Sequence, residues 1–158
     1  MTPREWDEAM MREALAEAKK AAALGEAPIG AVIVRDGEVI ARAHNLRESD
    51  KNALAHAEIL AIDRACRALG GWRLPGCTLY VTLEPCPMCA GAAINARIPR
   101  VVFGAFDPKA GSLGSLIDLS KVPYNHTLQL TGGILSDECA GLLRAFFAGL
   151  RRKSRVDP

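Results

Sequence analysis

The chain has 158 residues, of which 49% are hydrophobic and 24% charged, and its formal net charge at pH 7 is +2. This length and composition predict one globular domain over residues 1–158 with a sizeable buried core. No apolar run is long enough to cross a bilayer, and acidic residues stand near the start where a signal peptide needs basic ones, so we expect a cytoplasmic protein with no membrane partner.

The first half of the chain predicts a helix, a hairpin and a second helix. Thr2 and Glu5 are spaced as a capping box, and the helix that they open ends at Gly25. Apolar runs over 29–34 and 39–41 flank an Asp-Gly pair and predict a β-hairpin. After a polar loop over about 44–51, a helix is expected from about 53 to 69. Helical spacing predicts that its buried face consists of Ala55, Ile59, Ile62, Cys66 and Leu69.

The second half alternates strands with helices. Strands are predicted over 78–83 and 101–103, with a helix from Pro87 to about Ala96 between them and a weaker fifth strand over 127–130. Ser136 is the expected N-cap of a last helix. Its apolar stripe is formed by Leu142, Leu143, Phe146, Phe147 and Leu150. This order predicts an α/β fold with three layers, α/β/α, around a mixed five-stranded sheet.

Two short motifs carry the chemistry. His56 and Glu58 lie near the start of the second predicted helix, and Cys86 and Cys89 open the third helix directly after a strand. Helix N-termini and the carboxyl ends of strands face the same site in such sheets, which favours thiolates there. One imidazole and two thiols make the three ligands of a catalytic zinc, which leaves a fourth position for water. We therefore expect one Zn²⁺ per chain, a zinc-activated hydroxide as the nucleophile, and Glu58 as the proton shuttle.

Each motif alone has a plainer interpretation. A Cys-x-x-Cys pair can be a redox dithiol, and His-x-Glu at a helix start is usually a capping or surface feature. A structural zinc would need a fourth ligand, but the other three cysteines stand in apolar, periodic contexts typical of a core. Only the zinc interpretation uses all four motif residues. A cluster of basic residues near the C-terminal end has two interpretations: it contacts phosphates, or it is a solvated helix end. The cluster consists of Arg144, Arg151, Arg152, Lys153 and Arg155.

At these motifs the chain resembles zinc-dependent nucleobase deaminases, and in particular the bacterial tRNA-specific adenosine deaminases. The residues that match the family pattern are 55–58, 78–92 and 100–105, followed by 125–126, 133–135, 138–139 and 146–147. Residues 52–55 depart from the family pattern, which weakens any transfer of loop contacts there.

The resemblance implies a cytidine deaminase-like fold and hydrolytic deamination of adenosine to inosine at the wobble position of tRNA anticodons. It implies that His56, Cys86 and Cys89 are the zinc ligands and Glu58 the proton shuttle. It also implies that Asn45 and Ala57 contact the target nucleotide. Without the resemblance, an Asn at position 45 is typical of a turn after the hairpin. The expected partners are the tRNA anticodon stem-loop and a second copy of the chain in a homodimer.

Two other functions stay open at this point. The first is deamination of a free base or nucleoside, such as guanine, cytosine or cytidine, because the zinc motifs fix the chemistry but not the substrate. The second is a nucleic-acid-binding module with a structural metal. Residues 106–112 combine an aromatic residue, a cation and glycine, and either line an RNA groove or form an ordinary surface loop.

Overall fold

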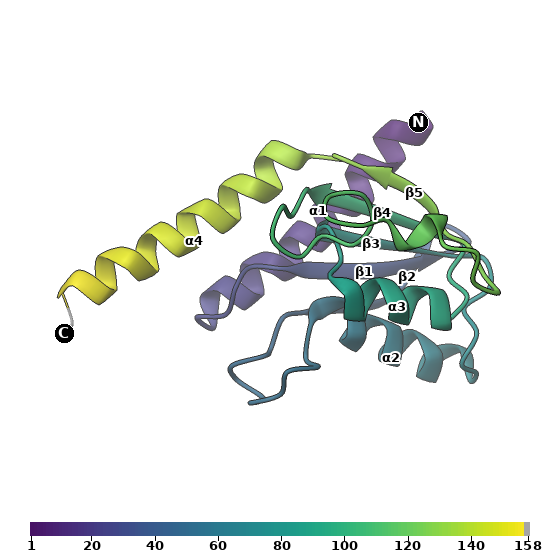
Figure 1. Ribbon diagram of the computed structural model, residues 1–158, viewed down its shortest axis with the longest axis horizontal. Coiled ribbons are helices and arrows are strands. Elements are labelled where there is room, and N and C mark those ends of the chain that lie inside the picture. Colours follow the sequence, from purple (N-terminus) through teal and green to yellow (C-terminus); the bar gives the residue numbers. More distant parts are fainter. Residues whose placement is uncertain (157–158) are drawn as a thin grey trace.

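The computed structural model describes residues 1–156, in which five strands form one sheet in the order β2-β1-β3-β4-β5 (Figure 1). Strand β1 (Gly30–Arg35) is antiparallel to both of its neighbours, β2 (Glu38–His44) and β3 (Cys77–Leu83). Strands β3, β4 (Arg100–Ala105) and β5 (Gln129–Gly132) are parallel. The predicted mixed sheet is confirmed, with β5 two residues later in the chain than expected.

Helices cover both faces of the sheet. Helices α2 (Ala57–Leu69) and α3 (Pro87–Asn95) pack on one face, and α1 (Pro3–Ala23) and the start of α4 (Ser136–Val156) pack on the other (Figure 1). Because side chains alternate along a strand, β3 supplies Leu79 to the core under α2 and α3, and Tyr80 to the core under α1 and α4. The three-layer α/β/α prediction is confirmed. A short 3-10 helix, η1 (Leu119–Lys121), lies between β4 and β5.

The face under α1 contains a buried ionic cluster. The Asp7 carboxylate accepts hydrogen bonds from the Arg100 guanidinium at 2.7 and 2.9 Å and from the Tyr80 hydroxyl at 2.8 Å. Burial, together with the hydrogen bond that the hydroxyl donates to Asp7, raises the pKa of Tyr80. The cluster ties α1 to β3 and β4 on the face of the sheet opposite α2 and α3.

The helix ends show which local predictions were right. The capping box of α1 is present, with Thr2 and Glu5 bonding each other's backbone. Helix α2, however, begins at residue 57 and not at 53, because the Asn52 side chain accepts a hydrogen bond from the Leu54 N–H at 2.9 Å and holds a turn there. His56 consequently occupies the N-cap of α2 in an extended conformation.

The later start also changes the buried face of α2. Its most buried small residues are Ala57, Ala61 and Ala65, which let the helix approach the sheet closely. Of the residues predicted for this face, Ala55 is buried but precedes the helix. The others are only half-buried at its flanks: Ile59, Ile62, Cys66 and Leu69.

Helix α4 differs from expectation at both ends. Ser136 is its first residue and not its N-cap, since the carbonyl of Leu135 accepts the first helical hydrogen bond, from Cys139. The C-terminal half extends past the sheet (Figure 1), so Phe147 and Leu150 of the predicted apolar stripe are exposed. Within residues 1–156, no helix combines the length and the apolar character needed to span a membrane.

Candidate active site

The predicted site residues meet where β3 ends and where α2 and α3 begin. His56 is the N-cap residue of α2, and Cys86 is the N-cap residue of α3 with Pro87 following as the first helical residue. Neither side chain caps its own helix, so the imidazole and the thiol remain available to other partners. The positive ends of two helix dipoles therefore face one point, which favours anionic side chains there.

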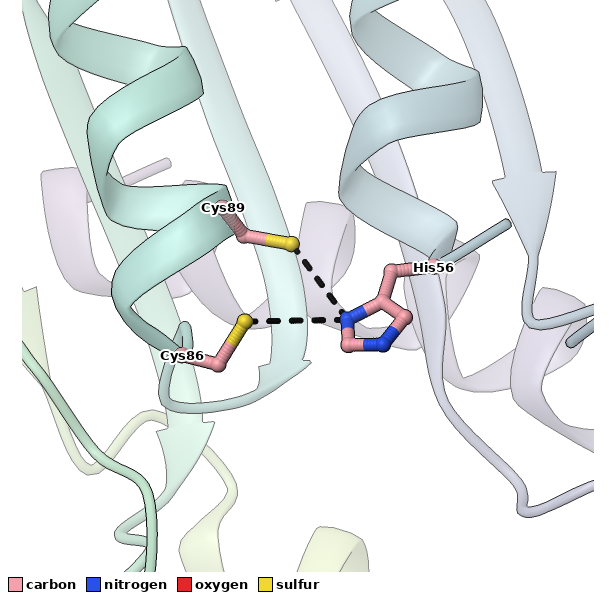
Figure 2. A group of neighbouring side chains, drawn as sticks. All are labelled: His56, Cys86 and Cys89. Atoms are coloured by element: carbon pink, nitrogen blue, oxygen red, sulfur yellow. Dashed lines mark hydrogen bonds between the residues drawn. The ribbon is translucent and has the colours of Figure 1, made fainter. Parts of the chain in front are cut away.

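The three candidate ligands point toward one another (Figure 2). Nδ1 of His56 lies 3.7 Å from Sγ of Cys86 and 3.5 Å from Sγ of Cys89, and all three donor atoms lie within 4.8 Å of one another. A tetrahedral zinc with bonds of about 2.3 Å to sulfur and 2.0–2.1 Å to nitrogen needs ligand separations of about 3.5–3.8 Å. The donor atoms therefore fit a zinc ion by both type and spacing.

In the part of the chain that the structure describes, no fourth protein ligand accompanies this trio. Among residues 1–156, His56, Cys86 and Cys89 form the single group of three or more His, Cys, Asp or Glu side chains placed to share a metal. As predicted, Cys77 and Cys139 are buried in the core, whereas Cys66 is half-buried. A three-ligand set is typical of a catalytic rather than a structural zinc.

The sulfur atoms of the pair differ in their affinity for protons. The hydrogen bond from the Cys89 thiol, assisted by His56, lowers the pKa of Cys86 to about 4. The same bond raises the pKa of Cys89, which acts as the donor, and the bond to Cys86 raises the pKa of His56. The half-buried Cys86 thus offers a thiolate at neutral pH, which suits a cation.

Glu58 lies in the first turn of α2, and only 4% of its surface is exposed. Burial disfavours the carboxylate and raises the pKa of Glu58 to about 7, with a further increase from the Cys86 charge. A carboxyl group with this pKa can both take up and release a proton near neutral pH, as a general acid/base must.

His56, Glu58 and Cys86 line a pocket of about 210 Å³, whereas Cys89 lies outside the lining. That volume is below the roughly 300–1,000 Å³ typical of sites for drug-sized ligands, so the pocket accommodates a ring system and leaves a larger substrate mostly outside. Its lining comprises Ala27, Ile29, Asn45, Arg47, His56, Ala57, Glu58, Leu83, Glu84, Cys86, Asp107, Ala110 and Phe147.

Asn45 is both a turn residue and part of the pocket lining. Its Oδ1 accepts from the Arg47 N–H at 3.1 Å, which is the turn expected after the hairpin, and its Nδ2 donates to the Ala27 carbonyl at 3.4 Å. The side chain is almost fully buried, yet it reaches the pocket together with Ala57. The structure thus brings both predicted substrate contacts to the same cavity as Glu58.

Phe147 connects the pocket to a second hollow, the α4 groove, of about 700 Å³. The α4 groove is lined by Lys109, Leu143, Arg144, Phe147, Leu150, Arg151, Ser154 and Arg155. Three members of the predicted basic cluster therefore face this groove, whereas Arg152 and Lys153 are not part of its lining. Residues of the 106–112 segment contribute to both hollows, as expected of a groove wall.

Sequence reasoning missed two buried acids beside the pocket, Glu26 and Glu84. The Glu26 carboxylate accepts from the backbone N–H groups of Glu48 and Ser49 at 3.1 and 2.5 Å, and so holds the loop that follows Asn45. Glu84 holds the segment after β4 in the same way. The one available signal was position, because Glu84 directly follows β3 and Glu26 stands three residues after the end of α1.

Comparisons with known proteins agree with this geometry. The family described as MafB19-like deaminase matches residues 5–151. The tRNA-specific adenosine deaminase of Bacillus subtilis is 59% identical over 151 residues, which cover 95% of this chain and 94% of that protein.

Two groups of solved structures are similar as well. One, from a study of A-to-I editing by tRNA:A34 deaminases at the wobble position, superposes with a TM-score of 0.83 at 47% identity, covering 85% of this chain and 99% of the other. Guanine deaminase from Nitrosomonas europaea superposes with a TM-score of 0.74 at 29% identity, covering 89% and 84%. At these levels of identity and coverage, the chain belongs to the tRNA-specific adenosine deaminase family, within the MafB19-like deaminases.

Proposed function

We propose that this chain hydrolyses adenosine to inosine and ammonia at the wobble position of a tRNA anticodon. One observation carries the proposal beyond family membership. A buried carboxyl with a pKa of about 7 lines a small pocket together with two of the three zinc-type ligands, and Phe147 belongs both to this pocket and to the groove lined by arginines.

The proposed roles follow from the chemistry of each group. His56, Cys86 and Cys89 would hold one zinc ion per chain, which supplies Lewis-acid activation of the attacking water when it is bound. Glu58 takes one proton from the attacking water and delivers it to N1 of the adenine ring. It then takes the second proton from the new hydroxyl on C6 and delivers it to the amine, which leaves as ammonia. Its burial suits the role, because a carboxyl with a pKa near 7 can give up that proton again.

Asn45 and Ala57 are proposed to orient the base. The Asn45 amide can both donate to and accept from a purine edge. Ala57 is the first residue of α2, where backbone N–H groups lack partners within the helix, so it can offer a donor without side-chain bulk. Both residues line the pocket that contains Glu58.

The α4 groove is proposed to carry the nucleotides next to the target base. An anticodon loop is single-stranded, so one base can be splayed into the pocket while its neighbours stack on aromatic side chains and pair their phosphates with cations. Phe147 stands at the junction of pocket and groove with 44% of its surface exposed, and Arg151 and Arg155 lie further along.

The alternative is a free base or nucleoside, and the similarity to a guanine deaminase structure favours testing it directly. The chain should be incubated with a tRNA that carries A at the wobble position, and separately with free guanine, cytosine and cytidine, with inosine and ammonia as readouts. We expect inosine at the wobble position and no turnover of the free compounds. Ammonia from guanine without inosine in the tRNA would refute the proposal.

We also propose that the chain forms a homodimer in the cytoplasm. Four large hydrophobic side chains are exposed between residues 116 and 124, namely Leu116, Ile117, Val122 and Tyr124. Several exposed apolar side chains in one short segment favour a protein–protein contact there. Light scattering should give a dimer mass, which Leu116→Glu with Ile117→Glu should reduce to that of one chain. A wild-type protein with the mass of one chain would contradict this.

A further inference from the structure

The segment over residues 106–115 forms one wall of the pocket. It leaves β4 and contains turns and a single bridge residue, Leu113, but no helix or strand pairing. Asp107 and Ala110 line the pocket, and Lys109 lines the α4 groove. Because no strand or helix ladder shapes this segment, its position depends on other contacts.

The Glu84 carboxylate makes most of these contacts. Glu84 directly follows β3, and only 1% of its surface is exposed. Its Oε1 accepts from the Asp107 N–H at 3.0 Å and from the Ser115 hydroxyl. Its Oε2 accepts from the N–H groups of Leu113 at 3.2 Å and Ser115 at 3.0 Å. One buried side chain therefore gathers both ends of the 106–115 segment.

The fit around Glu84 is close. A Cβ added at Gly111 would overlap the Glu84 carboxylate, so the segment can wrap the acid only with glycine at this position. The Ser112 N–H also donates to the Pro85 carbonyl at 2.9 Å, and the Glu84 N–H donates to the Ala105 carbonyl at 2.8 Å. The two residues that precede Cys86 thus hold the pocket wall.

We infer that Glu84 is a positioning residue that fixes the 106–115 wall relative to the candidate metal ligands. The inference rests on the proposed function, because the wall matters for activity only if the pocket binds the target base. A carboxylate suits the role because all four groups aimed at it are donors, and it can accept from every one. A glutamine has an NH₂ group in place of one carboxylate oxygen. This NH₂ group would face the donors that bond either Oε1 or Oε2 in the wild type, and their hydrogen bonds would be lost.

The test compares Glu84→Gln with Asp7→Asn in the zinc-loaded protein. Asp7 is a matched control, because it is also a buried acid with several donors but belongs to α1, on the opposite face of the sheet from α2 and α3. We expect Glu84→Gln to keep its zinc and to raise KM for an anticodon stem-loop by about tenfold or more, with a smaller change in kcat. Asp7→Asn should lower the melting temperature without this increase in KM.

Amide hydrogen exchange provides a readout that does not depend on activity. In Glu84→Gln, the amides of Asp107, Leu113 and Ser115 should exchange at least about tenfold faster, while those of α1 keep their wild-type rates. If Glu84→Gln fails to fold, Ser115→Ala, which removes one donor only, should show a smaller change in KM in the same direction.

The outcomes separate the inference from the proposed function. An unchanged KM, or an increase that Asp7→Asn reproduces, would overturn the role of Glu84, as would unchanged exchange in the 106–115 segment. A wild-type protein that leaves the stem-loop unmodified would refute the proposed function, whereas the exchange measurement would still decide whether Glu84 holds the wall.

Discussion

Replacing Glu58 by glutamine should abolish turnover and, at the same time, make the metal-free protein more stable above neutral pH. The carboxyl is buried, and burial raises its pKa from 4.5 to about 7. Glutamine has the same shape but stays neutral. The variant therefore removes the proton carrier and also the cost of an ionised group inside the protein.

The pH dependence of this gain follows from the two pKa values. Between pH 4.5 and about 7 the unfolded chain releases a proton that the folded chain retains, so the stability of the wild type falls as pH rises through this window. The difference between the two pKa values corresponds to about 3 kcal/mol of free energy of unfolding. The advantage of Glu58→Gln should thus grow by about 3 kcal/mol between pH 4 and pH 8. Bound zinc favours the carboxylate and should reduce this gain.

Turnover should change in the opposite direction. Loss of a general acid/base costs about 10²–10⁴-fold in rate, and a group that serves several proton transfers should lie at or beyond the upper end. Urea unfolding of chelator-treated protein at pH 4 and 8, inosine formation and zinc content measure the three effects. Asp63→Asn, an exposed acid on the same helix, is the control and should change none of them.

Three results would refute this reasoning. Substantial activity in Glu58→Gln would show that another group moves the proton. Loss of zinc would make Glu58 a ligand and not a shuttle. A stability difference that does not change with pH would show that the folded protein does not hold Glu58 protonated.

The remaining predictions concern the metal and the RNA. Wild-type protein should contain about one zinc per chain by elemental analysis, and Cys89→Ala should lose most of it; unchanged zinc would exclude the ligand role. Zinc affinity, measured by competition with a chelator, should fall as pH is lowered, because protons compete for the thiolates and the imidazole; constant affinity between pH 8 and 5 would contradict the site. Arg151→Gln with Arg155→Gln should weaken stem-loop binding and reduce its salt slope by about 0.7 per lost phosphate contact. Arg152→Gln with Lys153→Gln removes the same charge outside the α4 groove and should change the slope less; equal effects would exclude the groove.

Much of the fold follows from local patterns in the sequence. The capping box at Thr2 and the alternation of apolar runs place α1, the hairpin and the parallel strands, because each depends on neighbouring residues. The candidate ligands were predictable for a similar reason. Cys86 stands three residues after the end of β3 and directly before Pro87, so its place at a helix N-terminus and at a sheet edge is fixed by short-range order.

What the sequence did not reveal depends on contacts between distant segments. The apolar stripe of α4 has the same period whether it packs on the sheet or extends past it, so the exposure of Phe147 could not be predicted from periodicity. Burial of Glu26 and Glu84 depends on loops that are distant in sequence and supply backbone N–H groups. Hydropathy assigns such acids to the surface, because it does not include the donors that the fold brings to them.

The late start of α2 reconciles two requirements of the site. Residues two apart on a helix diverge by about 200°, so His56 and Glu58 could not face one pocket if both were helical. With the helix beginning at residue 57, His56 keeps an extended backbone (φ −75°, ψ 150°) and Glu58 lies in the first turn. Both then line the same cavity, with the imidazole beside the thiols and the carboxyl close by. The turn held by Asn52, which delays the start of α2 from the expected residue 53 to residue 57, is therefore what allows the His-x-Glu spacing to function.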